Sequence, residues 1–303
     1  MMNNDSAMKE LVNFLEKNAS GDMSEEEMNR LVAEFIKNQN NNPREAVTEK
    51  TAKTSDDFME LAYNADNMQD ALKFARKALK IDPDNLDAEC MVAELSATGS
   101  IDLLKKLDRA VKHGNEIMTA KGYMDEEYEG DFWLVLDTRP YMRVRLSYLQ
   151  ALIRCGMTGK AIAEGEDLIR LCSSDNNGVR YTLMHLYALM EMEDEAVALH
   201  NKFGNGNDTQ FLLPLSVLYY KKYELTMAGK YLDKLMRANK DFKLFIKELR
   251  DGKLSKYEKQ MNGYGYRPDS IEELIVELSE NAVLFDSALP FFAWADERIN
   301  SKR

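Results

Sequence analysis

The stretch that decides the fold is DALKFARKALKIDPDN, which runs from Asp70 to Asn85. Ala71, Ala75 and Ala78 recur at intervals of four and three residues, so they fall on one face of a helix. Small side chains on that face let a second helix approach closely. Pro83 cannot continue a helix and predicts a turn before the next one. The stretch therefore predicts the second helix of an antiparallel pair, followed by its exit.

Similar pairs recur along the chain, and each combines an apolar first helix with a small residue in the second helix. The further pairs are Val92-Ala93 with Leu103, Leu107 and Ala110; Tyr148, Leu149 and Leu152 with Gly156 and Ala161; Leu183, Met184 and Tyr187 with Ala196 and Phe203; and Leu215, Ser216 and Tyr219 with Ala228, Leu232 and Leu235. Ala161, Ala196 and Ala228 are 35 and 32 residues apart, close to the ~34-residue period of the tetratricopeptide signature. The pattern predicts an all-α fold, a tetratricopeptide-like right-handed solenoid of helix pairs with helical caps.

The flanking segments differ from the array in composition. Ser24 with Glu27 forms a capping box that begins an amphipathic helix, and the segment 38–50 is polar and asparagine-rich. We therefore predict an N-terminal helical segment and linker over 1–50, the array over 51–250, and a C-terminal capping segment over 251–303, where Ser270 with Glu273 forms a second box. Within the array, the segment from Gly114 to Pro140 predicts a longer helix plus a loop.

Composition and charge restrict the class of partner. The 303 residues include 52 acidic and 40 basic side chains, a formal net charge of −12 that repels phosphate backbones and anionic lipids. We expect no nucleic acid partner and no membrane association. Three cysteines without a CxxC spacing are typical of a reducing compartment, and the polar N-terminus does not resemble a secretory signal. A cytoplasmic location is the expectation.

Several stretches carry a family resemblance. The stretches 131–133, 138–143 and 175–181, with the spacing of Leu149, Leu152, Gly156 and Ala161, resemble bacterial tetratricopeptide proteins related to the suppressor-of-tumorigenicity-seven family. The turn-rich break at 264–270 and the aromatic ending at Trp294 resemble that family's C-terminal segment, so most of residues 50–300 is covered. Gly165 and Leu168 depart from the usual repeat pattern. The resemblance implies a helical-repeat protein that is not an enzyme.

Catalytic and cofactor chemistry finds little support in the sequence. His113, His185 and His200 are far apart, and no phosphate-binding or nucleophile-elbow motif occurs. We expect no catalytic residues, no metal and no cofactor. The acidic run 125–131 could bind a cation or a basic peptide, but a solvated loop is the simpler interpretation. The Gly204–Asp208 stretch is interpreted as a turn between two repeats.

In tetratricopeptide arrays the first helix of each pair lines a concave groove. Mapped through the resemblance, the partner-binding residues are Arg143, Gln150 and Arg154 in the third pair, Tyr181 and His185 in the fourth, and Val217 and Tyr220 in the fifth. Arginines and tyrosines suit an extended peptide that bears a carboxylate. The alternative is that Arg139, Arg143 and Arg180 pair internally with Asp131, Asp137 or Asp175.

The sequence thus predicts an adaptor or scaffold that binds a peptide segment of another protein. Two other functions stay open. The segment 114–143 could form the pocket of an enzyme or of a regulator that binds a small molecule. The terminal helices could instead mediate homo-oligomerisation.

Overall fold

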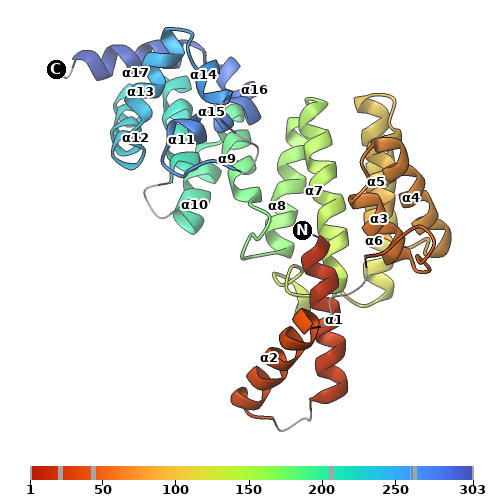
Figure 1. Cartoon of the computed structure of the whole chain (residues 1–303). Helices are drawn as coiled ribbons and strands as arrows, with labels where there is room; N and C mark the ends of the chain where they lie inside the picture. Colours follow the sequence, from red (N-terminus) through yellow and green to blue (C-terminus); the bar gives the residue numbers. More distant parts are fainter. Residues whose placement is uncertain are drawn as a thin grey trace. The chain divides into compact units, whose positions relative to one another are not determined.

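The computed structural model describes residues 2–19, 23–41, 46–204, 208–259, 261 and 265–301. Every regular element in these ranges is helical (Figure 1), which confirms the all-α prediction. The elements are α1 (Met2–Asn18), α2 (Glu25–Asn41), α3 (Ser55–Tyr63), α4 (Met68–Ile81), α5 (Leu86–Ser96), α6 (Ser100–Ala120), the short 3-10 turns η1 (Glu126–Tyr128) and η2 (Leu136–Thr138), α7 (Arg139–Arg154), α8 (Thr158–Leu171), α9 (Val179–Met190), α10 (Glu193–Phe203), α11 (Thr209–Lys221), α12 (Leu225–Ala238), α13 (Phe242–Arg250), α14 (Ser255–Glu258), α15 (Ile271–Glu280), α16 (Ala282–Asp286) and α17 (Pro290–Ser301).

The contacts between helices group the chain into two compact units. Unit 1 comprises residues 1–157 and 170–174, and unit 2 comprises residues 158–169 and 175–303. These limits differ from the predicted ones at residues 50 and 250, because the predicted array contributes helices to both units. Each unit is described by itself below.

In unit 1, neighbouring helices pack in chain order. The packed pairs include α3 with α4, α4 with α5, α5 with α6, and α6 with α7, and α5 also packs against α7. Ala75 and Ala78 of α4 are fully buried and lie in a core cluster with Met59 of α3. Pro83 lies between α4 and α5, as the sequence predicts. Contacts from each helix to the next and to the one after it are typical of helical repeats.

The segment from Gly114 to Pro140 contains the end of a long helix followed by turns, as predicted. Helix α6 spans 21 residues, and the chain from 121 to 138 then forms turns and the two 3-10 elements. Phe132 is buried and donates its backbone N–H to the carbonyl of Leu171 over 3.0 Å. A Cβ on Gly114 would lie 2.6 Å from Cδ2 of Tyr141, so only glycine allows this ring to pack on α6. Phe132 of this segment thus lies in the interior of unit 1, while the acidic side chains of residues 125–127 are exposed.

Unit 2 repeats the helix-pair pattern. Helix α9 packs against α10 and α11, and α11 packs against α12. The predicted anchors Ala161, Ala196 and Ala228 are fully buried. Five residues before each anchor, the backbone is left-handed, at Gly156 (φ 69°), which is assigned to unit 1, and at Glu191 (φ 58°) and Tyr223 (φ 62°) of unit 2. A shared turn at a shared distance from the anchor marks these helix pairs as structural repeats.

The terminal segments begin at the predicted caps. Ser24 and Glu27 form the predicted capping box of α2. Ser270 caps α15 by accepting the N–H of Glu273, whose carboxylate accepts the N–H of Asp269 in place of that of Ser270. Parts of three predicted segments lie outside the described residues. They are residues 42–45 of the linker, residues 205–207 of the turn at 204–208, and residues 262–264 at the turn-rich break.

No helix in the described part of the chain has both the length and the apolar character that a bilayer-spanning segment needs.

Candidate functional site

One face of helix α7 carries four polar side chains. Arg143, Ser147, Gln150 and Arg154 follow one another at intervals of four, three and four residues. This spacing places all four side chains on one face of the helix. The three groove residues predicted for the third pair therefore share one face, as the sequence indicates.

Part of this face lines an open hollow between α5, α6 and α7, called here the α5/α7 groove. The hollow has a volume of about 460 Å³ and is lined by Glu94, Leu103, Leu107, Leu146, Ser147, Gln150 and Arg154. A smaller hollow of about 200 Å³ shares Glu94, Leu103 and Arg154 with it. The lining of the α5/α7 groove thus combines three leucines, which form its apolar floor, with four polar residues, which form its rim. This combination suits a peptide side chain with hydrogen bonds at its edge.

The four polar residues that line the α5/α7 groove differ in whether they have an internal partner. The Ser147 hydroxyl donates to Oε1 of Glu94 over 2.8 Å. Gln150 and Arg154 are exposed, and neither side chain makes a hydrogen bond or ion pair with another described residue. A free guanidinium can hold a carboxylate through two parallel hydrogen bonds, and a free amide can both donate to and accept from a peptide backbone.

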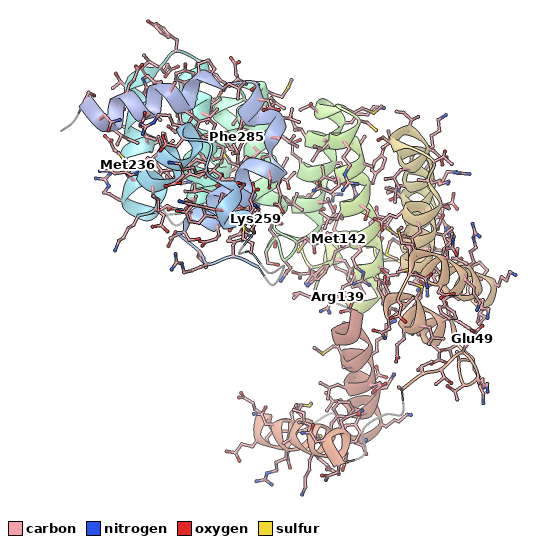
Figure 2. All side chains as sticks on the ribbon, turned by 45° about the horizontal axis from the view of Figure 1, so that its top comes forward. Glu49, Arg139, Met142, Met236, Lys259 and Phe285 are labelled. Atoms are coloured by element: carbon pink, nitrogen blue, oxygen red, sulfur yellow. The ribbon has the colours of Figure 1, made fainter. Side chains whose placement is uncertain are left out.

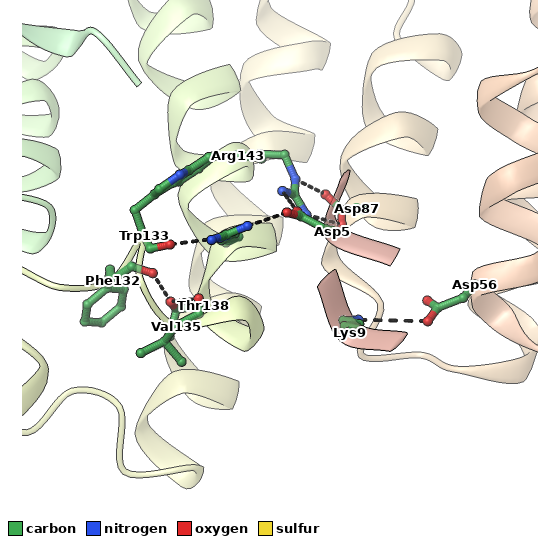
Figure 3. A network of polar contacts seen from close by, with 10 residues as sticks. Asp5, Lys9, Asp56, Asp87, Phe132, Trp133, Val135, Thr138 and Arg143 are labelled. Carbon is green, nitrogen blue, oxygen red and sulfur yellow. Dashed lines mark hydrogen bonds and ion pairs between the residues drawn. The ribbon is translucent and has the colours of Figure 1, made fainter. Parts of the chain in front are cut away.

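A network of ion pairs lies at the other end of the same face of α7 (Figure 3). Arg143 donates from Nε and Nη2 to the two oxygens of Asp87 on α5, each over 2.7 Å. Its Nη1 donates to Oδ2 of Asp5 on α1 over 2.6 Å, and Nη1 of Arg139 donates to Oδ1 of the same carboxylate over 2.6 Å. Arg139 also donates from Nε to the Trp133 carbonyl over 2.8 Å. The three helices α1, α5 and α7 therefore meet at these charges, and Figure 2 shows Arg139 at the end of α7 next to α1.

The carboxylates and guanidinium groups of this network stabilise one another in their charged forms. Burial acts to raise the pKa of Asp5, but the hydrogen bonds from Arg139 and Arg143 outweigh it and hold that pKa below its usual value. Burial acts to lower the pKa of Arg143, but Asp87 and Asp5 raise it. Arg143 is therefore a permanent cation held between two carboxylates. The alternative of internal pairing is found here, with Asp5 and Asp87 as the acceptors in place of the predicted Asp131 or Asp137.

Two predicted groove residues, Tyr181 and His185, belong to unit 2 and lie near the start of α9. Arg180 pairs with Asp175 over 3.0 Å, as the internal-pairing alternative predicts, and its guanidinium lies 4.6 Å from the Tyr181 ring. His185 is buried; its Nδ1 lies 2.7 Å from the Tyr181 carbonyl and its Nε2 lies 3.1 Å from Oε1 of Glu277 on α15. Burial raises the pKa of Glu277 to about 7. His185 thus joins α9 to α15 and has no exposed surface for a partner.

The fifth-pair residues Val217 and Tyr220 lie on α11. Val217 is fully buried, since α11 is covered on nearly every side, and its side chain cannot contact a partner in this structure. The Tyr220 ring lies 5.6 Å from Phe291 and 5.4 Å from Trp294 on α17. Tyr220 also lines an open hollow of about 500 Å³ together with Lys221, Tyr223 and Trp294.

Two observations concern the chemistry of the described residues, the state of the Cys90 thiol and the placement of possible metal ligands. Burial, together with the nearby Glu94 carboxylate, raises the pKa of Cys90 to about 12, so the thiol is protonated at neutral pH. Within the described ranges, no group of three or more His, Cys, Asp or Glu residues is placed to hold a metal ion.

Three residues of the site were not predicted from the sequence: Asp5, Asp87 and Glu94. Asp87 and Glu94 are seven residues apart on α5, so their shared face could have been recognised as an acidic partner for the basic face of α7. Asp5 gives no such signal, because 138 residues separate it from Arg143.

The chain matches no protein-family model and no curated protein. The resemblance to tetratricopeptide proteins related to the suppressor-of-tumorigenicity-seven family therefore stays a prediction.

Proposed function

We propose that this protein is a cytoplasmic adaptor built from tetratricopeptide-like helix pairs, and that it binds a peptide segment of another protein in the α5/α7 groove. The observation that carries this proposal is the pair Gln150 and Arg154, which line the groove and have no partner among the described residues. An exposed guanidinium beside an apolar hollow is a frequent centre of protein recognition.

The shape and charge of the groove favour a peptide over a small molecule. The hollow is open, whereas small-molecule sites enclose most of their ligand. Its chemistry provides one cation, one amide and one carboxylate around leucine side chains. An extended segment with an acidic side chain and an apolar side chain satisfies all of these groups.

The proposal is tested by a double variant, Gln150→Ala with Arg154→Ala, and by a control variant, Arg76→Ala. Arg76 is an exposed arginine on α4, away from the groove lining, so the control removes a surface arginine without changing the groove. After circular dichroism shows that all three proteins are folded, each is used to co-purify partners from the native cytoplasm. The affinity of the recovered partner is then measured by calorimetry.

We expect the groove variant to lose the partner and the control to keep it. Loss of one charge-assisted hydrogen bond costs about 1.5–3 kcal/mol, which is roughly a tenfold to hundredfold loss of affinity. Equal retention of the partner by the groove variant and the control would refute the groove as the binding site.

A second candidate function, self-association through α1 and α2, is supported by one observation. None of the described side chains of α2 is buried, although Phe35 contacts Phe14 of α1 with a ring distance of 5.4 Å. Ile36 is 53% exposed, and two short helices alone bury too little surface to be stable. A second copy of the hairpin would complete a four-helix bundle. Light scattering should then show a dimer that Ile36→Ser dissociates, and a monomer at high micromolar concentration would contradict it.

A further inference from the structure

We propose that the guanidinium pair of Arg139 and Arg143 is a receptor for a carboxylate of the partner, and that Asp5 of α1 occupies it as an intramolecular competitor. This inference rests on the proposed function, because it identifies the chemistry of the segment that enters the α5/α7 groove. The partner it predicts is an extended acidic peptide.

The arginine pair carries one more positive charge than Asp87 alone can neutralise. Asp87 engages Arg143 through two hydrogen bonds of 2.7 Å and so neutralises it. Arg139 has no carboxylate partner among the described residues other than Asp5. Without Asp5, the site would hold two guanidinium groups and one carboxylate. It is therefore complete only when a second carboxylate places one oxygen on each arginine.

The Asp5 carboxylate joins α1 to two arginines of α7 through hydrogen bonds of 2.6 Å each. An ion pair also joins Lys9 of α1 to Asp56 over 3.9 Å, with side chains 44% and 66% exposed. Exposed pairs of this kind contribute little. Helix α1 otherwise packs against α2, which has no buried residue. Movement of the hairpin off the arginine pair therefore exposes no buried residue of α2.

The arginine pair and the α5/α7 groove lie along the same helix, α7. Arg143 and Arg154 lie on the same face of α7 and are eleven residues apart, a distance of about 16 Å at ~1.5 Å per residue. An extended peptide covers this distance in about five residues. The fitting ligand thus has two carboxylates about five positions apart, one for the arginine pair and one for Arg154.

The Asp5 carboxylate lowers the affinity of the arginine pair for an acidic peptide. A tethered carboxylate acts at an effective concentration in the millimolar range, so a weakly binding acidic peptide has to displace Asp5. Removing the Asp5 charge should therefore raise the affinity for an acidic peptide, although Asp5 itself lies outside the groove.

The experiment uses the full chain and a fluorescein-labelled peptide of sequence DGSGSE, with NGSGSQ as the uncharged control probe. Fluorescence anisotropy measures the binding of each probe to wild type, Asp5→Asn and Asp5→Asn/Arg139→Gln. Asp5→Ala provides a second variant with the site open, and circular dichroism checks the fold of each protein. A second double variant, Asp5→Asn/Arg154→Ala, tests the contribution of the groove.

We expect Asp5→Asn to bind the acidic probe at least tenfold more tightly than wild type, and Arg139→Gln to remove this gain. The control probe should bind none of the proteins measurably. If both Asp5 variants fold and bind the acidic probe no better than wild type, the carboxylate receptor is refuted. If the gain appears but Arg154→Ala leaves it unchanged, the receptor stands and the groove of the proposed function fails.

Discussion

Replacing Arg143 by methionine should destabilise unit 1 strongly, because it leaves the buried Asp87 carboxylate without its cation. The Asp87 side chain is 8% exposed and the Arg143 side chain is 18% exposed. Methionine preserves much of the apolar length of the arginine side chain, so the charge and its hydrogen bonds are the main loss.

The size of the effect follows from the burial of the pair. Breaking a buried ion pair by removing one partner costs about 3–5 kcal/mol, because the remaining charge is uncompensated. Arg143 keeps some contact with water, so we expect about 3 kcal/mol. Asp87→Asn added to Arg143→Met should restore about 2 kcal/mol of this, since the uncompensated charge is then gone.

The assay must report on unit 1 alone, because a chain with two compact units need not unfold in one transition. The protein has two tryptophans, Trp133 in unit 1 and Trp294 in unit 2. In a Trp294→Phe background, Trp133 fluorescence follows the unfolding of unit 1 by urea. A loss below about 1 kcal/mol for Arg143→Met, with no recovery in the double variant, would refute the structural role of this pair.

Three further predictions concern single positions. The pKa of Glu277 is about 7 in the folded protein, whereas the ordinary value of the unfolded chain is 4.5. The free energy of unfolding therefore falls as pH rises between these values. Glu277→Gln should remove this slope in urea titrations, and an unchanged slope would contradict the burial argument. Gly114→Ala should destabilise unit 1 by about 1–3 kcal/mol, because the new Cβ would lie 2.6 Å from the Tyr141 ring. Gly159→Ala is the control, because its new Cβ would meet no atom within 4 Å, and it should leave the free energy of unfolding undiminished. Cys90 should resist iodoacetamide at pH 8 in the folded protein, as measured by mass spectrometry, and rapid labelling would show that its thiol is accessible and ionised.

The helix pairs could be predicted from sequence because the physics that sets them is local. Close packing of two helices requires a small residue at a fixed position, and Ala75, Ala161, Ala196 and Ala228 occupy such positions with no exposed surface. The N-terminal caps were equally readable, since Ser24 and Ser270 act on amides three residues away.

Only some of the residues that line the groove could be predicted from the sequence. The spacing on α7 placed Gln150 and Arg154 on one face, and both line the groove. Val217 failed as a groove residue because α11 is apolar on all sides, and a helix of that composition is buried rather than half-exposed. The sequence of α11 contained that signal.

The partners of the charged residues could not be predicted. Arg143 pairs with residues 56 and 138 positions away, and His185 lies against a residue 92 positions away. No periodic pattern relates such positions, since they meet only through the packing of whole helices. Charge alone suggested nearer aspartates for Arg139 and Arg143, and only Arg180 uses the nearby one that was predicted.

The most direct test of the central claim is photo-crosslinking in living cells from one position inside the α5/α7 groove and one outside it. A benzoylphenylalanine at Gln150 samples the groove, and the same residue at Arg76 samples the surface of α4. We expect a discrete adduct with a partner protein from Gln150 and none from Arg76. Adducts from Arg76 alone, or identical adducts from both positions, would contradict it.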